Sequence, residues 1–146
     1  MPTTKMMRLG EIADQREKVT IEPSASVTEA ARKMARAHKG AVLVESGGRL
    51  RGIFTERDLL MRVVAEGLDP ATTRLEQVMT DKLVVGDADE PYQWGLDRMV
   101  QAGCRHLPLV QGGRVVGMVS RRDLMAAEIR DLEQELDRVD PSNLFM

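Results

Sequence analysis

A seven-residue figure occurs twice in the chain, as GIFTERD at residues 52–58 and as GMVSRRD at residues 117–123. The second copy follows the first by 65 residues (123 − 58). At this offset residues 19–60 align with residues 84–125 without a gap, and seven of the fourteen positions from Gly47 to Leu60 are identical to their counterparts. Such a duplication restricts the chain to two like units built on one plan.

Each copy predicts the same order of elements, β-α-β-β-α. Gly-Gly joins two short apolar runs in each copy, which is a hairpin signal because two-residue turns between strands require positive φ. Pro91 falls in the first turn of a helix, where its missing N–H costs nothing. Thr55 and Ser120 each open a further helix. The other expected elements are a strand at Val19–Ile21 and a helix at Val27–His38, a strand at Leu83–Val85 and a helix at Pro91–Ala102, and the hairpins AVLVES–RLRGIF and HLPLVQ–RVVGMV.

A single unit of this kind leaves part of its surface uncovered. A three-stranded sheet with both helices on one side exposes an apolar face, and two copies can bury those faces against each other. We therefore expect an α/β (α+β) fold in which tandem β-α-β-β-α repeats pack with pseudo-two-fold symmetry. The connector carries Gly67 and Pro70, which end the preceding helix. The predicted division is an N-terminal segment at 1–16, repeat one at 17–66, a linker at 67–80, repeat two at 81–130, and a C-terminal helix extension and tail at 131–146.

The composition argues against several classes of partner. A net charge of −2 gives no electrostatic reason to expect nucleic acid or an anionic membrane. No apolar run approaches the roughly 20 residues that span a bilayer, and the first residues lack a signal-peptide core. The single cysteine, Cys104, excludes an internal disulfide and suits a reducing compartment. These features predict a soluble, cytoplasmic protein.

The last helix is expected to continue well beyond its counterpart in repeat one. Its apolar residues alternate spacings of four and three, a heptad-like stripe over two repeats. Two interpretations stay open: the stripe folds back on its own sheet, or it contacts a second copy in a dimer. Trp94 is expected to pack within the module or at a dimer face. The stripe consists of Met125, Ile129, Leu132, Leu136 and Val139.

The repeated figure itself has two interpretations. Thr55 with Asp58, and Ser120 with Asp123, fit the capping box, in which hydroxyl and carboxylate satisfy free N–H groups at a helix start. The same groups suit a nucleotide, because a helix start binds phosphate and a carboxylate can accept from both ribose hydroxyls. The glycine three residues before each hydroxyl would let a ligand or another backbone approach the strand. Spacing alone leaves both interpretations open but favours the cap, because the cap rests on fewer assumptions.

Several features together resemble one family. The duplicated β-α-β-β-α unit, the Gly-x-x-Thr/Ser-x-x-Asp figure in both copies, RHLPLV at 105–110 and the pair Met79-Thr80 resemble the CBS domain pair, or Bateman module. The resemblance covers roughly residues 17–130, and the chain looks like a stand-alone CBS-pair protein. It implies a regulatory sensor that binds an adenosine-containing ligand and signals through a homodimer or a protein partner. AMP is the first expectation for the ligand; ADP, ATP, NAD and S-adenosylmethionine are the others.

The resemblance also implies which residues line two clefts between the repeats. In the family the hydroxyl contacts phosphate and the Asp holds the ribose. Arg105 and His106 can give charge and donors to a phosphate, whereas their counterparts Gly40 and Ala41 cannot, so we expect the Asp58 site to be the better one. Site 1 would join Ile53, Thr55 and Asp58 to Val84, Cys104, Arg105 and His106. Site 2 would join Met118, Ser120 and Asp123 to Val19, Gly40 and Ala41.

Other chemistry finds little support in the sequence. Cys104, His106 and His38 do not have the number or spacing of zinc ligands, so no metal site is expected. No nucleophile has an adjacent base, which argues against an enzyme. The alternative function is a constitutive assembly module in which the Asp residues only cap helices. Nucleic-acid binding ranks behind both, because the charge is near neutral and aromatic residues are few.

Overall fold

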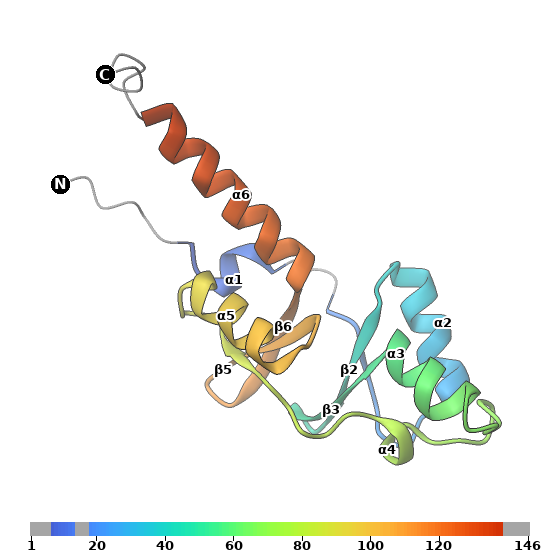
Figure 1. Ribbon diagram of the computed structural model, residues 1–146. Helices are drawn as coiled ribbons and strands as arrows, with labels where there is room; N and C mark the ends of the chain where they lie inside the picture. The colour runs from blue at the N-terminus through green and yellow to red at the C-terminus, as the bar shows by residue number, and fades with distance from the viewer. Residues whose placement is uncertain (1–6, 14–17, 139–146) are drawn as a thin grey trace.

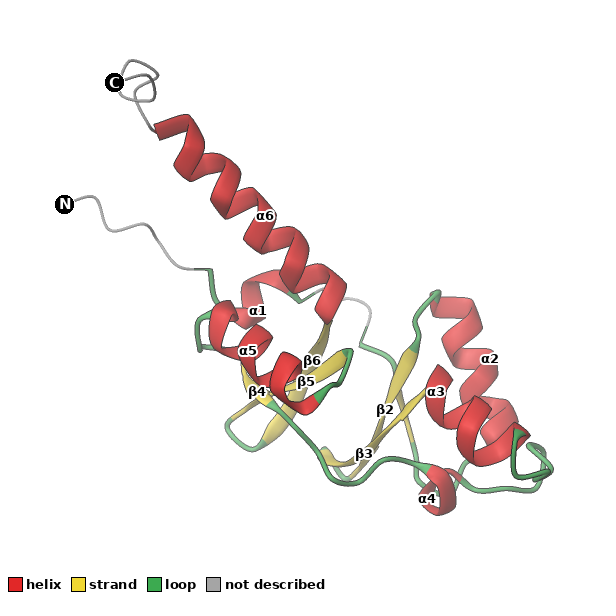
Figure 2. Cartoon of the chain, viewed as in Figure 1, coloured by secondary structure: helices red, strands yellow, loops and turns green. Residues whose placement is uncertain are grey.

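The computed structural model describes residues 7–13 and 18–138 (Figure 1). Its described strands form two three-stranded sheets, with the orders β1-β2-β3 and β4-β5-β6. The two repeats lie side by side, and the last helix projects from repeat two (Figure 2). This arrangement confirms the predicted mixed α/β fold of tandem repeats.

The elements of repeat one follow the predicted order. A parallel strand and an antiparallel hairpin form the sheet, and helices follow the first strand and the last. The final helix begins as α3 and continues as the π-helix η2, in which Ala65 N donates to Leu60 O, five residues earlier, over 2.9 Å. The elements are β1 (Thr20–Ile21), α2 (Val27–Ala37), β2 (Ala41–Ser46), β3 (Arg49–Thr55), α3 (Glu56–Asp58) and η2 (Leu59–Val64).

Repeat two has the same order with a longer final helix. Two short helices lie outside the repeated elements, one before repeat one and one between the repeats. The elements of repeat two are β4 (Gly86–Asp87), α5 (Tyr92–Ala102), β5 (His106–Gln111), β6 (Arg114–Ser120) and α6 (Arg121–Arg138), and the two additional helices are α1 (Leu9–Ile12) and α4 (Leu75–Val78).

Both hairpin turns have the predicted geometry. Gly47 and Gly48 have φ values of 61° and 80°, and Gly112 and Gly113 have 59° and 79°. Two successive positive φ angles define the primed turn whose twist matches that of the flanking strands. The Gly-Gly prediction is therefore confirmed in both repeats.

The first strand of repeat two begins later than predicted. In repeat one Leu43 N donates to Val19 O over 3.0 Å, which starts the parallel pairing. Pro108 occupies the counterpart of Leu43 and has no N–H to donate. The strand expected at Leu83–Val85 is consequently unpaired, and β4 begins at Gly86, opposite Leu109.

Two helix boundaries also differ by one residue from the sequence prediction. Pro91 is the N-cap of α5, with ψ at 140°, rather than part of its first turn. Because proline lacks an N–H, it fits the extended entry to a helix as well as the first helical position. His38 ends α2 as its C-cap, with φ 53° and ψ 42°, and lies outside the helix that was predicted to include it.

The two sheets bury apolar residues on both faces. Val42 and Val44 belong to the core formed with the helices of repeat one. Ala41 and Leu43 alternate with them along β2, point to the opposite face and are equally inaccessible. Strand β3 contacts β6 across the interface between the repeats. The expectation that two copies cover each other's apolar faces is confirmed.

The N-terminal helix α1 belongs physically to repeat two. Leu9 is completely buried in the core that contains Leu107 and Leu124. A Cβ atom added at Gly86 or at Gly95 would lie 2.8 Å from a methyl group of Leu9, so these two glycines make room for that side chain. Residues that precede repeat one in the chain therefore complete the core of repeat two.

Helix α6 does not fold its apolar stripe back on the sheet. Leu124 and Ala127 are buried against repeat two, and the Tyr92 hydroxyl donates to Asp131 on the same side of the helix. The residues of the stripe are about half exposed or more, with 47% at Met125 and 68% at Leu136, and Met125 and Ile129 line a cavity between the repeats. Val139, the last predicted member, lies outside the described residues. Trp94 is also exposed and does not pack within the module.

Candidate functional site

Two cavities lie between the repeats and share one wall. We call them the Asp123 cavity, with a volume of about 970 Å³, and the Thr55 cavity, with about 200 Å³. Both are lined by Gly40, Glu56, Arg105 and His106. The Asp123 cavity is further lined by Ile12, Val19, His38, Lys39, Met118, Ser120, Arg121, Arg122, Asp123, Met125, Ala126 and Ile129. The Thr55 cavity is further lined by Ile53, Thr55, Arg57, Thr80 and Cys104.

Both oxygens of the Asp58 carboxylate already accept hydrogen bonds from the protein. Its Oδ2 accepts hydrogen bonds from Thr55 N at 3.0 Å and Thr55 Oγ1 at 3.1 Å, and its Oδ1 accepts from Thr80 Oγ1 at 3.0 Å. Arg62 Nε lies 3.6 Å from Oδ1, and Asp58 is only 6% exposed. The capping box is complete, because Asp58 N donates to Thr55 Oγ1. As a result Asp58 is not a lining residue of either cavity.

The carboxylate of Asp123 is exposed in its cavity. Its Oδ2 accepts one hydrogen bond, from Ser120 N at 3.1 Å, and Ser120 Oγ accepts from Asp123 N at 3.1 Å. No described residue donates to its Oδ1. The counterpart of Thr80 at the offset of 65 is Gln15, which lies outside the described residues. Both copies therefore form the predicted cap, but only that of Asp123 leaves a carboxylate oxygen without a donor among the described residues.

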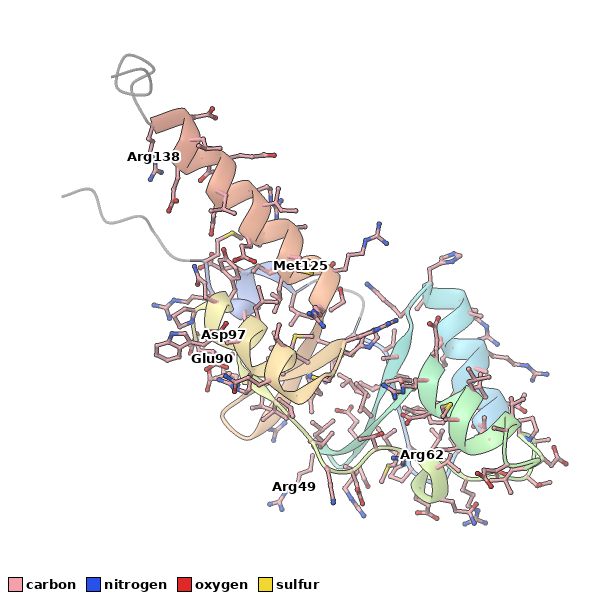
Figure 3. All side chains as sticks on the ribbon, viewed as in Figure 1. Arg49, Arg62, Glu90, Asp97, Met125 and Arg138 are labelled. Atoms are coloured by element: carbon pink, nitrogen blue, oxygen red, sulfur yellow. The ribbon has the colours of Figure 1, made fainter. Side chains whose placement is uncertain are left out.

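Close backbone approach explains why the first copy of the repeated sequence, GIFTERD, begins with Gly52. A Cβ atom at Gly52 would lie 2.9 Å from the Thr80 carbonyl oxygen, and Ile53 exchanges two backbone hydrogen bonds of 2.9 Å with Thr80. The same linker segment is held by Arg62, which is labelled in Figure 3 and donates to the Met79 carbonyl over 2.9 Å. Gly52 thus admits another backbone, one of the two predicted uses. Among the described residues, a Cβ at Gly117 would meet Ala13 alone, at an ordinary 3.6 Å.

Positive charge dominates the Asp123 cavity. Four cationic side chains and two carboxylates line it, and a histidine from each repeat adds two further donors. Burial is the main cause that lowers the pKa of His106, so its imidazole favours the neutral form. The backbone orients this wall, because Arg121 N donates to Arg105 O over 2.8 Å at the start of α6. The charged lining residues are Lys39, Arg105, Arg121, Arg122, Glu56 and Asp123.

The structure brings most of the predicted site residues together. Of the predicted site 2 set, Val19, Gly40, Met118, Ser120 and Asp123 line the larger cavity, whereas Ala41 is fully buried and does not line it. Of the site 1 set, Ile53, Thr55, Cys104, Arg105 and His106 line the smaller cavity, whereas Asp58 and Val84 do not.

Sequence reasoning missed several lining residues. Arg121 and Arg122 lie inside the second copy of the repeated sequence, GMVSRRD, and their positive charge was the signal that could have identified them as lining residues. Lys39 directly precedes the predicted Gly40. Ile12 carried no signal, because it reaches the cavity only through the docking of α1 on repeat two.

The described residues contain neither a group of metal ligands nor a helix that could span a membrane. The residues that the structure describes contain no group of three or more His, Cys, Asp or Glu side chains placed to hold a metal ion. Burial raises the pKa of the Cys104 thiol, which keeps it protonated and poorly suited to bind metal. Within residues 7–13 and 18–138, no helix combines the length and apolar character needed to cross a bilayer.

Comparison with known proteins identifies the duplicated unit. The family model of the CBS domain matches twice, at residues 9–65 and 75–130, which together cover most of the chain. This chain belongs to the CBS domain family. The first of these matches includes α1. A CBS domain-containing protein of Arabidopsis thaliana is 33% identical over 137 residues, which are 93% of this chain but only 24% of that protein. The chain thus spans about a quarter of the length of such curated plant relatives.

Solved CBS structures share the architecture described above. A putative signal-transduction protein with CBS domains from Burkholderia ambifaria is 29% identical, with a TM-score of 0.78, and the match covers 86% of this chain and 96% of that one. The CBS domain pair of protein MJ0100, crystallised with 5′-methylthioadenosine and S-adenosylmethionine, has a TM-score of 0.77, with 86% and 98% covered. At 22% identity the latter supports the fold alone.

Proposed function

We propose that this CBS pair is a regulatory module that binds an adenine nucleotide in the Asp123 cavity. The observation that carries the proposal is an exposed carboxylate at the start of α6, facing a cavity of about 970 Å³. Small-molecule sites commonly occupy roughly 300–1,000 Å³. The cavity is therefore large enough for a nucleotide, and Asp123 can accept hydrogen bonds from ribose hydroxyls.

The charge of the cavity supports a phosphorylated ligand. Lys39 and Arg105 reach the cavity from repeats one and two, and Arg121 and Arg122 lie at the start of α6. Guanidinium groups bind phosphate oxygens in a bidentate manner. We expect affinity to rise from adenosine to AMP and further to ADP and ATP. S-adenosylmethionine, whose sulfonium is cationic, is expected to bind more weakly than AMP.

The Thr55 cavity is a secondary candidate in this proposal. Its volume of about 200 Å³ is below the usual range for a nucleotide, and Asp58 does not line it, is only 6% exposed and already accepts hydrogen bonds at both carboxylate oxygens. The preference for the Asp58 site, which followed from Arg105 and His106, stays a prediction. Because both residues line both cavities, the charge of Arg105 and the N–H donor of His106 are also available to the Asp123 cavity.

Calorimetry with matched variants tests the assignment. Asp123→Asn and Asp58→Asn each remove one carboxylate from a helix start while nearly preserving its shape. Asp123→Asn should lower AMP affinity about tenfold or more, the effect of losing roughly 1.5–3 kcal/mol of charge-assisted contact, and Asp58→Asn should leave it within about twofold. The reverse order would assign the ligand to the Asp58 site. If wild-type protein binds none of the nucleotides, the constitutive assembly function is the better description.

We also propose that the module is a homodimer. Leu60, Met61 and Val64 on η2 are each more than half exposed and lie on one turn of the helix. A contiguous apolar patch of this kind is typical of an interaction site. Sedimentation should show a dimer at micromolar concentration, and Val64→Glu should dissociate it. A monomeric wild type would exclude the dimer and leave the nucleotide proposal untouched.

A further inference from the structure

Two carboxylates line the Asp123 cavity, and the proposed contact with ribose uses only that of Asp123. The other belongs to Glu56, which follows Thr55 directly and lies in the first turn of α3. Its side chain is exposed and lines both cavities between the repeats. Thr55 and Asp58 form the capping box of α3 between themselves, so the helix start is complete without the Glu56 carboxylate.

The contacts of Glu56 place its carboxylate in the wall that the two cavities share. Glu56 N donates to Gly40 O over 3.0 Å, and a Cβ atom at Gly40 would lie 3.3 Å from Glu56 Oε2. Because Gly40 has no Cβ, there is room for this carboxylate beside it. Burial lowers the pKa of His106, and the carboxylates of Glu56 and Asp123, one from each repeat, oppose that shift. Both negative charges therefore act on the same part of the cavity.

The charges that line the Asp123 cavity nearly match a single phosphate group. Four cationic side chains and two carboxylates give a formal net charge of +2 (4 − 2), with the histidines counted as neutral. A phosphate monoester, as in AMP, carries about −1.5 to −2 at neutral pH. Each further phosphate of ADP or ATP adds negative charge that this lining does not balance, and the Glu56 carboxylate repels it.

The position of Glu56 carries the opposite charge in the second copy of the repeat. Its counterpart at the offset of 65 is Arg121, which lines the same cavity from the start of α6. The duplicated fold therefore accommodates either charge at this position. Glutamate at position 56 is consequently not required by the backbone, and its charge is available to discriminate between ligands.

We propose that Glu56 is a specificity-determining residue of the Asp123 cavity, which limits the preference for ligands with more than one phosphate. This inference rests on the proposed nucleotide binding and adds a selective role to it. The cations attract a phosphorylated ligand, and Glu56 opposes each further unit of negative charge. Affinity then rises less steeply from AMP to ATP than the four cations alone would produce, and uncharged adenosine is indifferent to Glu56.

Calorimetry with adenosine, AMP and magnesium-free ATP at low ionic strength tests this role. Glu56→Gln removes the charge while nearly preserving the shape, and Glu56→Lys reverses the charge. Because the electrostatic effect scales with ligand charge, Glu56→Gln should raise AMP affinity about threefold and ATP affinity about tenfold, and leave adenosine within about twofold. Glu56→Lys should raise the ratio of ATP to AMP affinity further, and added salt should reduce these differences.

Glu29→Gln is the matched control, because Glu29 lies in the first turn of α2 and lines neither cavity. It should leave all three affinities within about twofold. An unchanged ratio of ATP to AMP affinity in both Glu56 variants, or an effect on adenosine as large as that on ATP, would overturn the selective role while the proposed function stands. A wild type that binds neither AMP nor ATP would instead refute the proposed function, and the selective role with it.

Discussion

Truncation of Leu9 probes the unexpected attachment of the N-terminal helix. Leu9→Ala removes a completely buried side chain from a site where Gly86, Gly95 and Leu107 surround it closely. Leu→Ala changes in well-packed cores cost about 2.7–5 kcal/mol, and more where the site cannot collapse. Two glycines offer no side chain that could move into the space, so we expect a loss of about 3–5 kcal/mol in the free energy of unfolding.

Urea denaturation measures this loss, and two further variants sharpen it. Val100→Ala, at a side chain on α5 that is 51% exposed, should change stability by less than about 0.5 kcal/mol. Gly95→Ala alone should destabilise, because its Cβ would lie 2.8 Å from Leu9 Cδ2. The double variant should be more stable than Leu9→Ala alone, since the new methyl group enters the vacated space and alanine favours the helix by about 1 kcal/mol. Additive effects of the two changes, or a cost below about 1 kcal/mol for Leu9→Ala, would refute the docking.

Three further predictions concern ligand binding, pH and the last helix. Arg105→Ala should weaken AMP binding about tenfold or more, through a lost contact of roughly 1.5–3 kcal/mol, and should hardly affect adenosine; equal calorimetric losses would make Arg105 structural. The hydrogen bonds from Arg98 lower the pKa of Glu90 below its ordinary 4.5. The pair therefore stabilises the fold above the unfolded pKa and loses this effect as pH falls through the folded value, so that Glu90→Gln should flatten the acid side of a stability curve measured by urea denaturation. Tyr92→Phe removes the donor to Asp131 and should cost about 0.5–1.5 kcal/mol, with a thermal melt as the measurement; an unchanged melt would exclude a role for this hydrogen bond in anchoring α6.

Features with a local cause could be predicted from the sequence. The Gly-Gly turns require positive φ whatever surrounds them, and the structure contains that φ at both turns. The caps of Thr55 and Ser120 likewise depend on residues three apart, and both form. The duplication predicted the pairing of two apolar sheet faces, because a single repeat could not bury its own.

Features with a distant cause could not be predicted. Nothing near Leu9 indicates that a lone leucine enters a core completed by residues about a hundred positions later. The hydrogen bond to Asp58 Oδ1 comes from Thr80, which lies at the end of the predicted linker. The late start of β4 depends on Pro108, whose missing N–H matters only once the strands are paired. Each of these residues could be read from the sequence, but the residue that it contacts in the fold could not.

The wall that the two cavities share has a consequence for occupancy. Arg105 lines both spaces, so its guanidinium is one source of charge with two possible counterions. An anion bound on one side neutralises the field that would attract an anion on the other, and at short range in a partly dry setting such repulsion is weakly screened. The electrostatic part of binding is therefore antagonistic between the cavities. By linkage this antagonism is reciprocal, so the second anion binds to a less positive protein than the first, whichever cavity fills first.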